Sequence, residues 1–147
     1  MSLTRLDAIA AALERLPDVL TAAVPDVVRD NAFLLELENQ QQLEAGLNKD
    51  GHSIRPEYSY LTVLYKQEAG EPYDRVTLRD TGDFYGSIVA EVRGQALEME
   101  ATDPKTEELQ EKYGEAILGL SDDAVGEFCR EVLKPELQDL TRKTFGI

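Results

Sequence analysis

The first third of the chain carries apolar residues at spacings of three and four, which place them on one face of a helix. Over residues 3–16 these positions are held by Leu3, Leu6, Ile9, Leu13 and Leu16. Pro17 and Pro25 each end a helix or open the next one at its first turn. A second apolar stripe and a run of strong helix formers, ELENQQQLEAG, predict a long helix over residues 25–45 with Gly46 as its C-cap.

The pattern changes after Gly46. Residues 47–59 are rich in turn formers and predict a loop. Residues 60–67, YLTVLYKQ, are dense in aromatic and β-branched residues, which fit either a strand or a short helix, and we favour a short helix that runs into extended chain. Residues 88–101 alternate between apolar and polar side chains around a Gly-Gln pair, and this period of two predicts a β-hairpin.

The last third returns to helical patterns. The stretch TDPKTEELQEKYG predicts a short polar helix, and Ser121 is a good N-cap for a longer one that Pro135 should kink or break. The whole pattern predicts one α+β domain over residues 1–147. In it, a small antiparallel sheet that includes the 88–101 hairpin is flanked by a long N-terminal helix and a C-terminal helix. We expect residues 1–22 to form an N-terminal helical segment that is extended from the body or mobile.

Composition and charge narrow the functional classes. The chain has 147 residues, with 15 basic and 29 acidic side chains, for a net charge of −14. Nucleic-acid binding needs clustered Lys and Arg, so we expect no sequence-specific nucleic-acid partner. We find no membrane-length apolar run and no signal-peptide pattern, so we expect no membrane partner and synthesis in the cytoplasm. An acidic surface is typical of a soluble protein, or of one that meets a basic partner.

Asp80, Thr81 and Gly82 spell the active-site tripeptide of aspartic proteases. That chemistry needs two carboxylates that share one proton. This chain has one copy, so a protease would be a homodimer that uses Asp80, with Ile117-Leu118-Gly119 as its second apolar element. Charged neighbours and a helical first half favour a different hypothesis. In it, Asp80 caps a short turn of helix over residues 81–86, with Phe84 and Ile88 pointing inward and Gly82 giving the turn room.

Other residue types offer little chemistry. Around Gly51, the spacing partly fits a calcium loop, but its first position is Gly46, which has no carboxylate. His52 is the single histidine and is expected to be exposed in the loop, whereas Cys129, the single cysteine, is expected to be a small buried hydrophobe. We therefore predict no catalytic, cofactor-binding or metal-binding residues.

Six tyrosines support two hypotheses. They pack half-buried around the sheet, or they form an assembly surface, because tyrosine is common at protein interfaces. They are Tyr58, Tyr60, Tyr65, Tyr73, Tyr85 and Tyr113.

The stretch TGDFYGSI, residues 81–88, resembles a pattern of phage tail-completion or virion-morphogenesis proteins, in which Thr-Gly, an apolar residue and Ser-Ile precede a β-hairpin. The residues that match are Thr81, Gly82, Phe84, Ser87 and Ile88. The segment EKYGEAILGLSDDAVGEF is similar to the family's Tyr-containing segment, its Leu-Gly-Leu step and its final helix. The resemblance implies a neck or tail-end ring protein from a phage or prophage, without catalysis.

The first hypothesis for function is therefore a virion protein that completes the tail or joins head to tail. Its partners would be other copies of itself in a ring and the portal or connector and tail-tube proteins. It would be made in the bacterial cytoplasm and reside in the virion. Asp80, Thr81, Gly82, Phe84, Tyr85, Ser87, Ile88 and the hairpin would form the assembly motif, and the 47–60 loop would contact a partner. The alternatives are the homodimeric protease and a small acidic adaptor or inhibitor.

Overall fold

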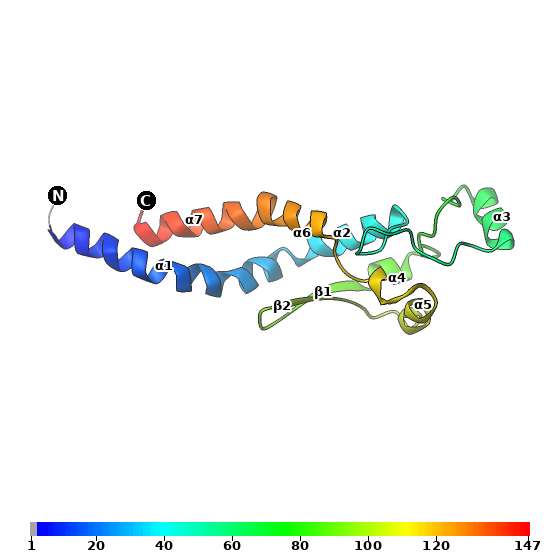
Figure 1. Ribbon diagram of the computed structural model, residues 1–147, viewed down its shortest axis with the longest axis horizontal. Helices are drawn as coiled ribbons and strands as arrows, with labels where there is room; N and C mark the ends of the chain where they lie inside the picture. The colour runs from blue at the N-terminus through cyan, green and yellow to red at the C-terminus, as the bar shows by residue number, and fades with distance from the viewer. Residues whose placement is uncertain (1–2) are drawn as a thin grey trace.

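The computed structural model describes residues 3–147, and it confirms the α+β class. It is an elongated molecule with both termini toward one end and α3 at the other (Figure 1). The α-helices are α1 (Leu3–Asp30), α2 (Ala32–Glu44), α3 (Tyr60–Ala69), α4 (Asp83–Gly86), α5 (Thr106–Tyr113), α6 (Asp122–Phe128) and α7 (Lys134–Phe145). Strands β1 (Ile88–Arg93) and β2 (Ala96–Ala101), the 3₁₀ turn η1 (Glu115–Ile117) and the π turn η2 (Cys129–Leu133) complete the chain. The part of the expected 1–22 segment that falls on residues 1–2 lies outside the described residues.

The boundaries of the first helices differ from the prediction. α1 continues through Pro17 and Pro25, and the break comes at Asn31 rather than at either proline. Pro17 has no N–H to donate to the carbonyl one turn earlier in the helix. Because Pro17 is exposed, that carbonyl lies next to solvent. At Asn31 the backbone leaves the helical region, and the side-chain Nδ2 donates to the Val27 carbonyl at 2.8 Å. The single helix predicted over residues 25–45 is therefore wrong: its first part belongs to α1 and the rest to α2.

The 88–101 hairpin is confirmed. β1 and β2 pair antiparallel from Ile88 opposite Ala101 to Arg93 opposite Ala96, and no further strand joins them within the described chain. The inner end of the hairpin packs against α2 and reaches the core. That core is built from Leu43, Ile54, Val76, Leu78, Phe84, Tyr85, Ile88, Ile117 and Leu118.

The two terminal helices form an antiparallel pair, which we call the stalk (Figure 1). Asn31, just after α1, donates a hydrogen bond to the Glu136 carboxylate at 3.1 Å, near the start of α7. Pro135 does not break the C-terminal helix. It lies in the first turn of α7, directly after the π turn, so the helix accommodates the missing N–H by widening locally.

Candidate assembly surfaces and the network behind them

The Asp80-Thr81-Gly82 turn is built differently from the prediction. Gly82, at φ +92°, holds the N-cap position of α4, so the Asp80 carboxylate lies too far from the helix start to cap it. The Thr81 Oγ1 instead accepts a hydrogen bond from the Asp83 N–H at 3.2 Å. The Asp80 side chain is 76% exposed, and its carboxylate lies 3.9 Å from the Lys105 ammonium. The predicted cap by Asp80 is therefore wrong, and Thr81 closes the turn.

The residues that follow this turn point into the core. Phe84 and Ile88 are buried, as predicted. Ser87 donates from Oγ to the Phe84 carbonyl at 2.8 Å, which holds the step from α4 to β1. Tyr85 is buried too, and its hydroxyl donates to the Thr77 carbonyl at 2.6 Å. Burial and the neighbouring Glu44 carboxylate raise the pKa of Tyr85 far above its ordinary value, so the hydroxyl remains a donor across the physiological range.

The extended segment 76–78 is buried without a partner strand, and side chains satisfy its backbone. The Tyr58 hydroxyl accepts from the N–H groups of Thr77 and Leu78 at 3.0 and 3.1 Å. Lys66, on the inner side of α3, donates to the Arg79 carbonyl at 2.9 Å and lies over the Tyr58 ring. Sequence reasoning missed Lys66, because nothing in YLTVLYKQ marks a lysine as the buried residue.

An open cavity of about 280 Å³ lies beside this segment and is lined in part by Asp80. Its other ionisable groups are already paired. Glu44 lies 3.8 Å from Arg79, and Glu71 lies 3.3 Å from Lys66. The ionisable groups that line the cavity are therefore paired within one chain. Asp80 pairs with Lys105, which takes no part in the other two ion pairs.

The polar side of α2 binds backbone from segments far along the chain. Asn39 is fully buried, donates to the Ile117 carbonyl at 3.0 Å and accepts from the Gly119 N–H at 2.9 Å. Gln42 repeats this two-sided contact: it donates to the Gly119 carbonyl and accepts from the Ser121 N–H. The predicted N-cap Ser121 is confirmed, since its Oγ accepts from the Ala124 N–H. The segment ELENQQQLEAG, which the sequence predicts only as helix-forming, therefore also binds the 117–121 turn.

The 47–59 loop folds on itself and holds no ligand cluster. Asn48 accepts from the N–H groups of Asp50 and His52, and Leu47 pairs with Ser53. His52 is exposed, and Cys129 is half-buried rather than buried. Across residues 3–147, no group of three or more His, Cys, Asp or Glu residues is placed to hold a metal ion.

α3 presents apolar residues to solvent. Leu61 is 76% exposed and Tyr65 is 63% exposed, with Leu64 beside them, while Lys66 on the opposite side is buried. The exposed residues are spaced at i, i+3 and i+4, the arrangement that normally faces a core. Tyr60, at 76% exposure, extends the surface. We call Tyr60, Leu61, Leu64 and Tyr65 the α3 surface.

The tyrosines divide between the two hypotheses. Tyr85, Tyr58 and Tyr113 are buried or half-buried in or against the core, whereas Tyr60, Tyr65 and Tyr73 are exposed. Packing against the core is therefore confirmed for three of the six tyrosines, and an assembly role for the three exposed ones stays a prediction.

No family model, no curated protein and no solved structure matches this chain. None of the helices described is long and apolar enough to cross a membrane.

Proposed function

We propose that this chain is a structural protein of a phage or prophage particle, one that completes the tail or joins head to tail by assembling into a ring. Its partners are other copies of itself, the portal or connector, and the tail tube. The chain works by shape: the core and the hairpin hold the body together, and the surfaces at its two ends make the contacts. The resemblance of residues 81–88 to the tail-completion pattern supports this proposal.

The observation that carries the proposal is the α3 surface. Burying one large apolar side chain is worth about 1.5–3 kcal/mol, and α3 leaves several of them in water at the far end of the molecule. Such a surface is typical of a protein–protein contact. The 47–60 loop, which is the expected partner contact, leads from α2 into α3 (Figure 1).

The molecular charge fits a component whose ring forms only on a specific partner. A net charge of −14 repels other copies in free solution. Specific apolar contacts, and basic groups on a partner, overcome this repulsion when the ring forms.

The test is removal of the gene from the phage or prophage that encodes it, followed by electron microscopy of the particles. We expect heads and tails that are not joined, and repair by the wild-type chain. The double variant Leu61→Ser/Tyr65→Ser should fold but not repair the defect. The matched control is Gln67→Ser/Ala69→Ser, which changes two exposed α3 residues outside the α3 surface and should repair it.

Normal joined particles from the deletion would overturn the proposal. So would capture of a single basic partner by the purified chain with no ring in the particle, because that outcome belongs to the adaptor alternative. Circular dichroism and urea unfolding of each variant separate a lost contact from a lost fold.

A further inference from the structure

The stalk has almost no core of its own. From residue 6 to residue 26, Ala12 is the one α1 side chain that is buried, and no residue of α7 is buried. Helices in water depend on tertiary packing of their apolar face for most of their stability. The 28-residue α1 contains two prolines and packs on the 12-residue α7, and most of its residues from 6 to 26 stay exposed.

α1 carries a continuous apolar stripe with alternating spacings of three and four. It consists of Leu6, Ile9, Leu13, Leu16, Leu20, Ala23 and Val27. The inner part of this stripe is half-buried or buried, but Leu6 is 48%, Ile9 38% and Leu13 57% exposed. Figure 1 shows that α1 extends beyond the end of α7. The stripe thus continues the α1–α7 contact past the point where α7 ends, in the register of a helix–helix seam.

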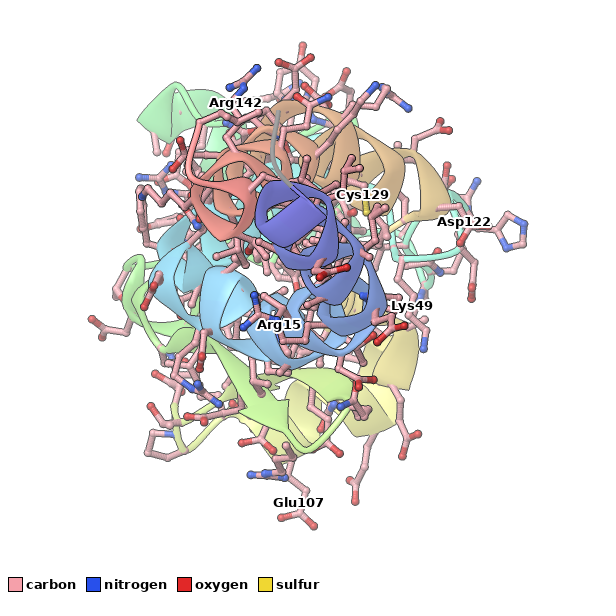
Figure 2. All side chains as sticks on the ribbon, turned by 90° about the vertical axis from the view of Figure 1, so that its left-hand side faces the viewer. Arg15, Lys49, Glu107, Asp122, Cys129 and Arg142 are labelled. Atoms are coloured by element: carbon pink, nitrogen blue, oxygen red, sulfur yellow. The ribbon has the colours of Figure 1, made fainter. Side chains whose placement is uncertain are left out.

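α7 also has apolar residues that α1 covers only in part. Leu137, Leu140 and Phe145 are half-buried, and Ile147, which follows the end of α7, is 86% exposed. Figure 2 views the stalk from the end that carries both termini, with α7 along one side of α1 and Arg142 and Arg15 on different sides of the pair. An open two-helix pair of this kind buries its remaining apolar edge when a second pair packs against it.

The charges of the two helices complement each other. Residues 6–20 of α1 have three acidic side chains and one basic, whereas residues 134–147 have three basic and two acidic. Residues 6–20 are therefore net negative and residues 134–147 net positive, so α1 of one copy and α7 of another attract each other. Together these two segments carry −1 of the −14 of the chain, so the stalk adds little to the repulsion between copies.

We propose that the stalk packs on the stalk of a second copy of this chain, with α1 of each copy against α7 of the other in a four-helix bundle. Leu6 and Ile9 lie beyond the end of α7, so in this bundle they and Leu13 pack against the same residues of the other α1 at the free end. This contact is separate from the α3 surface and does not depend on a role in a virion.

The test is the molar mass of the purified full-length chain by size-exclusion chromatography with light scattering, over a range of concentrations. We expect the wild type to have at least twice the 16.4 kDa of one chain. The variant Leu6→Glu/Leu13→Glu places charges in the contact and should have the mass of one chain. The matched control, Ala11→Glu/Ala22→Glu, adds the same charge on the exposed side of α1 away from the stripe and should keep the wild-type mass.

Urea unfolding followed by circular dichroism shows whether each variant retains the core. A wild-type mass of one chain at every concentration up to about 1 mM would overturn the inference, because a contact weaker than that supplies only about 4 kcal/mol. Equal dissociation of the control variant would also overturn it. Either result would leave the proposal for α3 intact, since the particle assay reads a different surface.

Discussion

Individual side chains in this protein satisfy backbone that has no secondary-structure partner. Tyr58 and Tyr85 bind the backbone of the buried 76–78 segment, and Lys66 binds the Arg79 carbonyl that follows it. A buried backbone group without a partner costs about 1–3 kcal/mol, so these contacts decide whether the segment can lie in the core. The sequence shows the tyrosines but not which backbone atoms they reach.

Gly46 is a position where a single added methyl group should lower stability. Its φ is +76°, and an added Cβ would lie 2.8 Å from the Arg75 Cβ. Gly51 has the same φ but open space around it, so it serves as the control. We expect Gly51→Ala to lower the free energy of unfolding by about 1–2 kcal/mol, through left-handed strain alone. Gly46→Ala should cost about 1–3 kcal/mol more, through overpacking.

Urea unfolding of the two variants measures this difference directly. Equal losses at Gly46 and Gly51 would mean that the backbone at Arg75 shifts at little cost and that the close approach has no energetic weight.

Asp80→Asn distinguishes the structural role of this residue from a catalytic one. The carboxylate is exposed, and its ion pair with Lys105 is worth at most about 1 kcal/mol. We therefore expect the variant to unfold within about 0.5 kcal/mol of the wild type and to function normally in the particle assay. Loss of a self-cleavage activity with intact folding would contradict this and favour the protease.

At the scale of elements, α2 joins the parts of the fold that lie far apart in the sequence. Its amide side chains bind the 117–121 turn, Gln40 donates to the Tyr85 carbonyl, and the Glu36 carboxylate accepts from the Ala90 N–H of β1. Its polar residues are therefore internal contacts, although the same residues read as solvent-facing helix formers in the sequence. This explains why α2 lacks the apolar stripe of α1.

Asn39→Leu should show how much this docking face contributes. The substitution removes a buried donor and a buried acceptor, which leaves the Ile117 carbonyl and the Gly119 N–H without partners. We expect a loss of about 2–5 kcal/mol in the free energy of unfolding. Gln41→Leu, on the exposed side of the same helix, controls for the change in composition and should cost less than about 0.5 kcal/mol.

Both variants are compared by chemical denaturation at equal protein concentration. An Asn39→Leu protein as stable as the Gln41→Leu protein would show that water replaces the amide contacts, and that the turn is held by Ile117 and Leu118 alone.

At the scale of the whole molecule, shape and charge act in opposite directions. The chain is elongated and leaves apolar residues exposed at both ends, which favours association. Its net charge of −14 opposes association of any two copies. The balance between these terms depends on ionic strength, because salt screens the repulsion between exposed charges but not the burial of apolar surface.

Self-association should therefore strengthen when salt is added. Raising sodium chloride from about 0.05 M to 0.5 M shortens the Debye length well below the width of the molecule, so the dissociation constant of the wild type should fall. Analytical ultracentrifugation at each salt concentration provides the measurement. Dissociation on adding salt would instead mean that opposite charges, rather than the apolar stripe, hold the copies together.

The sequence alone determined the features that depend on local periodicity and local turn chemistry. The hairpin over residues 88–101, the cap at Ser121 and the inward placement of Phe84 and Ile88 are confirmed, because alternation and capping act over a few neighbouring residues. The tertiary structure alone decided that α1 runs through its prolines and that Lys66 and Asn39 lie inside. Those outcomes depend on which distant backbone groups need a hydrogen-bond partner and on which helix faces stay in water. The spacing of residues along the chain does not determine either of these.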